Sequence, residues 1–373
     1  MKASHLALVS LLAGSAPICQ ALSMPHWSSE SETRLEKRLQ RVAYAGINIA
    51  GCDFGMETNV STNSLYAECE LMLKDVKGDS GTPNCPSSVG PTQMQHFATN
   101  DHLNLFRLPV GWPYLVNYDL GGPLDATFFS TYDQLMQACL ATGALCILDV
   151  HNYARWYGGI IGQGGPTNDQ FGNLWAQLAQ KYASKSNVVF GLMNEPHDLD
   201  MTTWAATVQN AVYAIRDNGA TTQMILLSGT NYDAVGGFQT NSAPALSSVI
   251  DYDGSNDKLI YEAHQYLDGD GGELTQCITN GVTDQLAPLT TYLRSVGRKA
   301  MLTETGGGNT ASCFTDVCAE LSHLNWNNDV WLGWVGWAAG SFDSTYNLTE
   351  TPNGNTDTAL VTNCIAGKFN NPP

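Results

Sequence analysis

Basic residues are scarce in this chain of 373 residues: 17 Lys and Arg stand against 35 Asp and Glu, a formal net charge of −18 at pH 7. Proteins that bind nucleic acids or anionic membranes carry basic patches, so this composition argues against both kinds of partner. An acidic surface is compatible with a neutral substrate. We therefore expect neither nucleic acid nor a membrane as a partner.

Metal-binding and redox motifs are also missing. The sequence has ten cysteines but no C-x-x-C pair, and it has no H-E-x-x-H stretch. These absences weaken a zinc or redox interpretation, so we expect no metal and no cofactor. In an exported protein, cysteines usually form disulfides. Nine remain once Cys19 in the N-terminal segment is set aside, and this odd number predicts one unpaired thiol.

No apolar run reaches the length of about 18 residues that a membrane-spanning helix needs. The apolar stretch Leu6–Pro17 follows Lys2 and precedes small residues, which is typical of a secretory signal peptide over residues 1–21. The pair Lys37–Arg38 predicts a second cut that removes residues 22–38, and an ordinary charged segment explains it equally well. We expect a secreted, extracellular protein.

The remaining residues, 39–373, show neither an internal repeat nor a Ser/Thr/Pro-rich linker. A solenoid is therefore not expected, and we predict one monomeric domain without a separate binding module. Asn59 and Asn347 begin N-x-S/T sequons, which predict N-glycosylation of a secreted protein.

Eight short, mostly apolar runs predict β-strands, and after the first their ends are 33 to 43 residues apart. Buried parallel strands have continuous apolar runs rather than alternating patterns. The runs are Gly46–Ile49, Leu103–Pro109, Leu145–His151, Val188–Asn194, Met224–Ser228, Lys258–His264, Lys299–Glu304 and Trp331–Trp337.

Helix-like stretches lie between these runs, at Asp125–Thr142, Gln170–Lys185, Thr202–Asn218, Asp284–Val296 and Phe314–Asn325. Strands and helices that alternate over eight units indicate a single α/β domain, a (β/α)8 TIM barrel. The alternative is an open doubly wound sheet, which would have fewer strands and a glycine-rich turn directly after the first strand.

Polar residues gather where the predicted strands end. In a (β/α)8 barrel the carboxyl ends of the strands form the active-site face, so these residues are candidates for one site. The stretch VVFGLMNEPHDL, residues 188–199, places an acid at the end of a charge-free run. The strand-end residues are Arg107, His151, Asn194, Glu195, His264, Tyr266, Glu304 and Trp337.

Glu195 and Glu304 are the informative pair. Two facing carboxyl groups can hydrolyse a glycosidic bond if one holds a proton and the other is ionised. Arg107 could keep the nucleophile ionised, and Tyr266 could donate a hydrogen bond to it. Asn194 could bind the sugar hydroxyl beside the reacting carbon.

The other strand-end residues have less specific roles. His151 and His264 could bind hydroxyls or tune the acid. Trp337 could stack on a sugar ring, but with two further tryptophans close by, a place in the core is an equal alternative.

Four further acids are rivals of the pair. Asp149 and Glu262 each precede a histidine by two residues on the same strand face, so we expect them to orient these histidines. Asp198 and Asp200 lie at a predicted helix start, where we expect both to act as caps.

The stretches FRLPVGW, DVHNYARW, GLMNEPHDL and LTETGGGN together resemble glycoside hydrolase family 5, and more narrowly the secreted fungal endo-β-1,4-glucanases of that family. The similarity runs from about Tyr44 to Cys364. It implies a (β/α)8 barrel and a retaining double displacement. By motif, Glu195 corresponds to the acid/base and Glu304 to the nucleophile. The family's substrate-site residues fall on Arg107, His151, Asn194, His264, Tyr266 and Trp337.

The resemblance also implies three disulfides, Cys139–Cys146, Cys277–Cys313 and Cys318–Cys364. The chain departs from the family pattern at Met56, where close relatives have a cysteine after the residues DFG. Cys52, Cys69 and Cys85 then remain, and among them we expect Cys69–Cys85.

The function expected is an endo-β-1,4-glucanase that acts on β-glucan, with poor action on crystalline cellulose because no binding module is found. A β-mannanase or a β-1,3-glucanase is the alternative within the same fold. A carbohydrate-binding barrel without catalysis is the alternative from another class, and the presence of both Glu195 and Glu304 argues against it.

Overall fold

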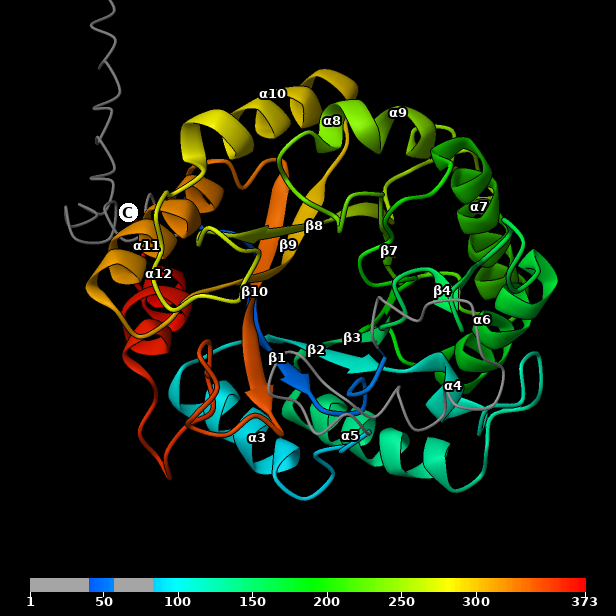
Figure 1. Cartoon of the computed structure of the whole chain (residues 1–373), viewed down its shortest axis with the longest axis horizontal. Helices are drawn as coiled ribbons and strands as arrows, with labels where there is room; N and C mark the ends of the chain where they lie inside the picture. Colours follow the sequence, from blue (N-terminus) through cyan, green and yellow to red (C-terminus); the bar gives the residue numbers. More distant parts are fainter. Residues whose placement is uncertain (1–39, 57–82) are drawn as a thin grey trace, which may run out of the picture.

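The computed structural model describes residues 40–56 and 83–373, and within these ranges eight parallel strands close into a barrel (Figure 1). The order around the barrel is β1-β10-β9-β8-β7-β6-β3-β2, so each strand neighbours those before and after it in the barrel series. The predicted (β/α)8 fold is confirmed. The barrel strands are β1 Tyr44–Ala50, β2 Leu105–Val110, β3 Leu145–Val150, β6 Val188–Gly191, β7 Ile225–Leu227, β8 Leu259–Tyr266, β9 Ala300–Gly306 and β10 Trp331–Gly340.

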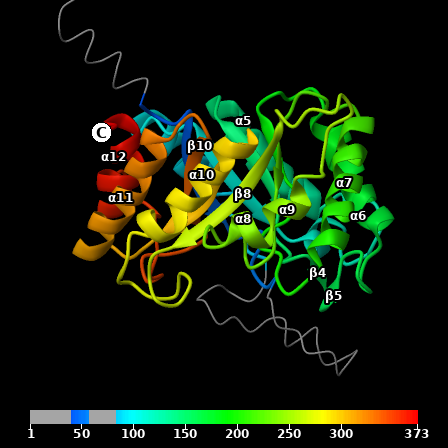
Figure 2. The same ribbon diagram turned by 90° about the horizontal axis from the view of Figure 1, so that it is seen from above.

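Helices surround the barrel, as both views show (Figures 1 and 2). A short hairpin of β4 (Arg155–Trp156) and β5 (Gly159–Ile160) follows β3. Two π-helical turns, Val282–Leu286 and Val361–Ile365, lead directly into α10 and α12. The helices are α3 Gly90–Asn100, α4 Trp112–Leu115, α5 Phe128–Thr142, α6 Asn168–Tyr182, α7 Met201–Asp217, α8 Phe238–Asn241, α9 Ala243–Leu246, α10 Ala287–Val296, α11 Ala311–Trp326 and α12 Ala366–Asn370.

The barrel interior is filled by an apolar layer to which seven of the eight strands contribute one buried side chain each. Its members are Leu105, Ile147, Val189, Leu226, Ile260, Met301 and Val335. Side chains two residues further along a strand point the same way, which raises a second, polar layer above the first. Arg107, Asp149 and Glu262 occupy that layer. The alternation of side chains along each strand therefore places the polar residues directly above the packed apolar layer.

Local signals set the ends of the helices. Thr167 and Gln170 form a reciprocal capping box at the start of α6. Asp200 caps α7 by accepting a hydrogen bond from the Thr203 N–H at 2.7 Å, as expected. Asp198 does not cap this helix; its carboxylate lies 2.9 Å from His197 Nδ1 instead, because the chain turns back there with a positive φ of 46° at Asp198.

The described residues contain four disulfides. Cys139–Cys146, Cys277–Cys313 and Cys318–Cys364 are three of them. The fourth joins Cys52 to Cys85, so the expected Cys69–Cys85 pair is wrong. The Asn84 N–H donates to the Gly51 carbonyl at 2.7 Å, and this contact brings the segment before α3 against the end of β1. Cys69 lies outside the described residues, as do Asn59, Cys19 and residues 1–38.

In the described ranges, no helix combines the length and the apolar character needed to cross a membrane. Asn347 is exposed on the connection after β10, and its side-chain amide donates to the Glu273 carbonyl at 3.0 Å. Its glycosylation stays a prediction.

Candidate active site

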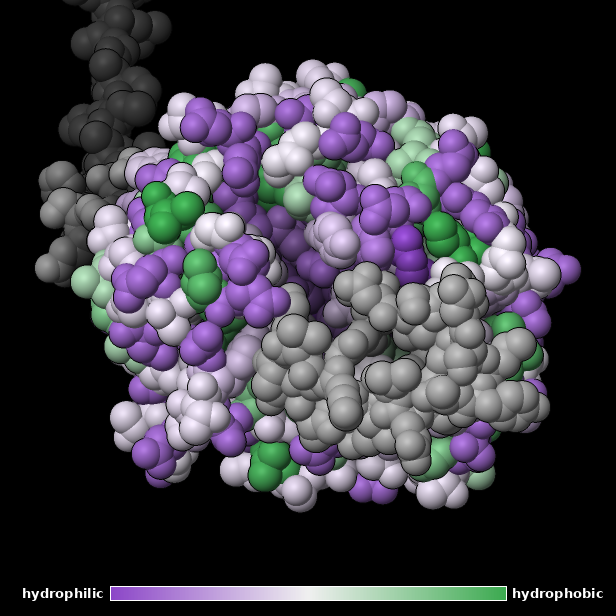
Figure 3. Space-filling model, viewed as in Figure 1, coloured by the Kyte–Doolittle hydropathy of each residue, from purple (hydrophilic) through white to green (hydrophobic). Residues whose placement is uncertain are grey.

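One end of the barrel carries the predicted strand-end residues, and direct contacts link them. A polar hollow lies near the middle of this view of the surface (Figure 3). The structure places in this group Arg107, His151, Asn194, Glu195, His264, Tyr266, Glu304 and Trp337.

Glu304 is the most firmly held carboxylate of the group. One oxygen accepts a hydrogen bond from Arg107 Nη1 at 2.7 Å, and the other accepts one from the Tyr266 hydroxyl at 2.6 Å. His264 Nδ1 lies 3.7 Å from the second oxygen. The pairing register between β8 and β9 shifts just before Glu304, an irregularity that lets Thr303 and Glu304 both contact His264 inside the barrel.

Electrostatics keep Glu304 ionised. Burial alone would raise the pKa of this carboxyl, but the positive charges of His264, Arg107 and His151 and the Tyr266 hydrogen bond outweigh it. The net result lowers the pKa of Glu304 to about 2. The group is therefore a carboxylate at any pH above that value.

Arg107 is a fully buried cation at the centre of this network. Besides Glu304, it lies 3.1 Å from an Asp149 oxygen and 3.4 Å from a Glu262 oxygen. Burial lowers the pKa of Arg107, but the carboxylates of Asp149, Glu304 and Glu262 raise it overall. Removal of the guanidinium would leave several buried negative charges without the cation that they share.

Glu195 lies just beyond β6 in a different environment. Its backbone has a positive φ of 47°, and its N–H donates to Asp233 Oδ2 at 3.0 Å. Among the described residues, its carboxylate makes one side-chain hydrogen bond, to His264 Nδ1 at 2.9 Å. The side chain is 18% exposed, against 4% for Glu304. This carboxyl can therefore meet both solvent and a ligand.

His264 connects the two carboxylates. Its Nε2 lies 3.0 Å from the Thr303 hydroxyl, which donates to Glu262 at 2.8 Å. Glu262 Oε1 also lies 3.8 Å from His264 Nε2, so Glu262 contacts His264 both directly and through Thr303. Burial lowers the pKa of His264, but Glu304, Glu195 and Glu262 raise it well above its ordinary value.

His151, directly after β3, and Trp337 on β10 contact each other. His151 Nδ1 lies 2.8 Å from Asp149, as expected, and its ring stacks on that of Trp337 with centroids 5.5 Å apart. Trp337 is half-buried, whereas Trp331 and Trp334 are fully buried in the core. Its indole N–H donates to the Tyr346 hydroxyl at 3.0 Å. Trp337 is therefore not fully buried in the core, although it packs against a small apolar cluster that includes Phe54 and Phe342.

Asn194 offers a free donor. Its Oδ1 accepts a hydrogen bond from Arg107 Nη2 at 2.7 Å, which fixes the amide orientation. The buried Nδ2 has no hydrogen-bond acceptor within the described part of the chain. An unpaired buried amide is unfavourable unless a ligand supplies the acceptor.

Four residues of the site were not anticipated from the sequence. Asn48 on β1 accepts a hydrogen bond from Arg107 at 3.1 Å, and a single polar residue within an apolar run could have indicated it. Asp233, Thr303 and Tyr346 each contact a predicted residue. Tyr346 comes from the connection after β10, for which the strand pattern gives no signal.

A carboxylate oxygen from each glutamate and one His264 ring nitrogen lie within 4.8 Å of one another, so these three residues could also hold a metal ion. The sequence predicts no metal, and that stays a prediction.

The chain is similar to known proteins in both sequence and fold. Residues 26–340 match the family model described as Cellulase (glycosyl hydrolase family 5). Endoglucanase EG-II of Hypocrea jecorina is 55% identical over 335 residues, covering 88% of this chain and 78% of that protein. Endoglucanase 1 of Saitozyma flava is 45% identical and covers 96% of each chain.

A solved structure gives the same result. The crystal structure of Cel5A (EG2) from Hypocrea jecorina (Trichoderma reesei) superposes with a TM-score of 0.78 at 53% identity, covering 87% of this chain and 98% of that one. The chain therefore belongs to the cellulase family of glycosyl hydrolases, family 5.

Proposed function

We propose that this protein is a secreted, monomeric endo-β-1,4-glucanase that hydrolyses internal bonds of β-glucan by a retaining double displacement. The pair of differently held carboxyl groups, Glu304 and Glu195, carries the mechanism. The family membership and the relatives named endoglucanases support the substrate. Four disulfides support an oxidising, extracellular environment.

Glu304 serves as the nucleophile. A nucleophilic carboxylate must be ionised and must be held in place, and Glu304 meets both needs through Arg107 and Tyr266. In the first step one of its oxygens attacks the anomeric carbon. The bond to the leaving oxygen breaks, and a glycosyl ester forms.

Glu195 serves as acid and then as base. Its partly exposed carboxyl can give a proton to the leaving oxygen and later take one from water. The water oxygen then attacks the anomeric carbon, and the ester bond to Glu304 breaks. His264 lies against both glutamates and orients Glu195 by its hydrogen bond.

The distance between the carboxyl groups favours retention. One oxygen of each lies within 4.8 Å of the other. Retaining enzymes place their carboxyl groups ~5–5.5 Å apart, whereas inverting enzymes need ~6.5–9.5 Å to admit a water. A gap this small does not hold the extra water of an inverting site.

The walls bind the sugar. The free Asn194 amide can donate to the hydroxyl beside the reacting carbon, and the Trp337 ring offers an apolar face. His151 stacks on the same indole and is tied to Asp149, so this wall is rigid.

The test is proton NMR of the first sugar released from a soluble β-glucan, with reducing-sugar assays on carboxymethylcellulose, mannan and laminarin. We expect the β-anomer first and the fastest hydrolysis on β-1,4-glucans. An α-anomer would contradict the retaining route, and faster hydrolysis of mannan or laminarin would contradict the substrate. No hydrolysis at all would leave a binding protein.

A further inference from the structure

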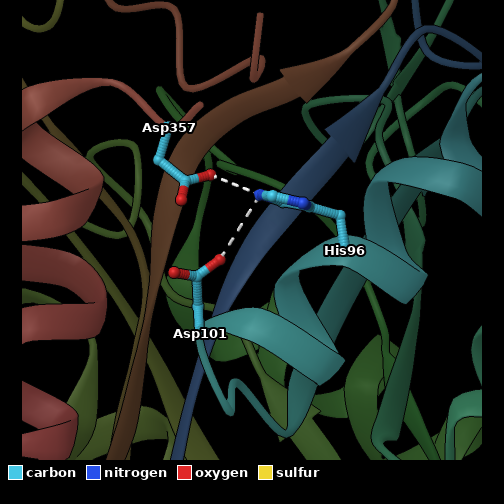
Figure 4. Close-up of side chains that lie close together, drawn as sticks. All are labelled: His96, Asp101 and Asp357. Carbon is cyan, nitrogen blue, oxygen red and sulfur yellow. Dashed lines mark hydrogen bonds and ion pairs between the residues drawn. The ribbon is translucent and has the colours of Figure 1, made fainter. Parts of the chain in front are cut away.

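A second group of metal-ligating side chains lies outside the barrel, at the end of α3 (Figure 4). His96 is in the last turns of this helix, Asp101 follows it directly, and Asp357 belongs to the connection between β10 and α12. His96 Nε2 lies 2.7 Å from Asp357 Oδ1 and 3.7 Å from Asp101 Oδ2. The three donor atoms all lie within 4.8 Å of one another.

These separations suit a small divalent cation. Zn²⁺ binds nitrogen and oxygen ligands at ~2.0–2.2 Å, which places two neighbouring ligands of one ion roughly 3.0–3.5 Å apart. The two distances from His96 lie on either side of this range. Shifts of a few tenths of an ångström would bring both distances from His96 into this range, and the carboxylate oxygens of Asp101 and Asp357 lie within 4.8 Å of each other.

The charges in the cluster are unbalanced. His96 can place one Nε2 proton between the carboxylates, and it makes its shorter contact with Asp357. The buried Asp101 Oδ2 receives no hydrogen bond from the described residues. Within these ranges, neither carboxylate forms an ion pair with a Lys or Arg. A divalent cation would compensate both negative charges at once.

The orientation of the His96 ring is fixed by Asn100, whose side-chain Nδ2 lies 2.9 Å from His96 Nδ1. A metal-binding histidine usually donates its other ring N–H. Metal binding through Nε2 therefore requires the Asn100 amide to present its oxygen to Nδ1, with the two amide atoms exchanged. The His96 side chain is 7% exposed, which limits competition from solvent.

Helix α3 contacts the 341–360 connection at two places. On the same helix, Gln93 exchanges two hydrogen bonds with Gly340 at the end of β10, at 3.0 and 2.8 Å. Helix α3 therefore holds the 341–360 connection at its start through Gln93 and near its end through Asp357. Between these points lies Tyr346, the hydrogen-bond partner of Trp337.

We propose that His96, Asp101 and Asp357 form a structural site for a divalent transition-metal ion that fastens the 341–360 connection to α3. One imidazole and two carboxylates suit Zn²⁺ and Mn²⁺ better than Ca²⁺, which prefers oxygen ligands alone. The ion stabilises the fold and takes no part in bond cleavage.

Calorimetric titration of ZnCl₂ and MnCl₂ into the chelator-treated full chain tests the site, with thermal melting as the second measurement. We expect one ion per chain at this site and a higher melting temperature with metal. Asp357→Asn and Asp101→Asn should each weaken this binding by about 10-fold or more. Glu195→Gln, which alters the other candidate cluster, should leave it unchanged.

Two results would overturn the proposal. One is the absence of binding heat and of any melting shift with both metals. The other is binding that survives in both aspartate variants but is lost in Glu195→Gln, since the ion would then occupy the barrel site. Circular dichroism of each variant checks the fold, and anomalous diffraction at the zinc edge locates the ion directly.

Discussion

The ends of β9 and β6 carry the same type of residue in opposite settings. Glu304 on β9 is enclosed by a guanidinium, a phenol hydroxyl and an imidazole, and its carboxylate is almost fully buried. Glu195, beyond β6, makes one side-chain hydrogen bond in the described structure and is partly exposed. The comparison shows how one fold gives two glutamates different settings, and these settings fit the two roles that we propose: partners fix the charge of one, and exposure lets the other exchange protons.

The largest expected effect comes from Glu304. In Glu304→Gln the amide cannot form the glycosyl ester, so turnover should fall at least about 10⁴-fold on every substrate. Steady-state kinetics on carboxymethylcellulose and on an aryl cellobioside measure this loss. Asp270→Asn, an exposed acid on the loop after β8, is the control and should keep full activity. A Glu304→Gln variant within tenfold of the wild type would exclude the assigned role.

The next effect separates the two carboxyls. Glu195→Ala should lower turnover of glucan by about 10²–10⁴-fold, because the leaving oxygen receives no proton. An aryl cellobioside with a very good leaving group needs no protonation, so its first step should be spared. Added azide should then restore turnover by replacing water as the second nucleophile. Identical behaviour of the Glu195 and Glu304 variants on this substrate would show that the division of roles is wrong.

A smaller effect is expected at the cleft wall. Trp337→Ala should lower kcat/KM on soluble glucan by about tenfold, taking ~1–3 kcal/mol for the loss of an aromatic stacking surface. Trp326→Ala is the matched control, since Trp326 is 55% exposed on α11. Equal kcat/KM values for the wild type and Trp337→Ala would remove this residue from the substrate site.

Glu320 on α11 faces β9 from outside the barrel and offers a second comparison with Glu304. It is fully buried like Glu304, but its side-chain hydrogen bond comes from the Thr305 hydroxyl at 2.6 Å, and no cation lies beside it in the described structure. Burial raises the pKa of Glu320 from about 4.5 to about 8. Between these values the folded protein keeps a proton that the unfolded chain releases, so the free energy of unfolding falls as pH rises.

Glu320→Gln should remove this pH dependence. Between pH 4.5 and 8, this group should lower the free energy of unfolding of the wild type by up to about 1.4 kcal/mol per pH unit. The variant should lack this contribution. Urea unfolding at pH 5, 6.5 and 8 measures the difference, with Asp270→Asn as the control. Equal slopes in the wild type and Glu320→Gln would mean that Glu320 titrates normally. Burial also raises the pKa of Glu350. Glu350 therefore makes the free energy of unfolding fall with pH in all variants alike.

The strands and most of the site could be predicted because buried parallel strands are apolar along their length and end at one face. The prediction placed Asn194 within a strand, but β6 ends at Gly191. The Asn194 N–H still donates to the Val150 carbonyl of β3 at 2.9 Å, and its side chain reaches the buried Arg107. Tyr346 and the Cys52–Cys85 bond could not be predicted, because both depend on loops whose course is set by packing rather than by periodicity.

The most direct test of the central claim is mass spectrometry of the protein after reaction with 2-deoxy-2-fluoro-cellobiosyl fluoride. Attack at the anomeric carbon releases fluoride and leaves a glycosyl ester that the ring fluorine makes slow to hydrolyse. We predict one added 2-deoxy-2-fluoro-cellobiosyl group per chain, attached to the peptide that contains Glu304. An ester on the Glu195 peptide, or active enzyme that forms no adduct, would contradict the account.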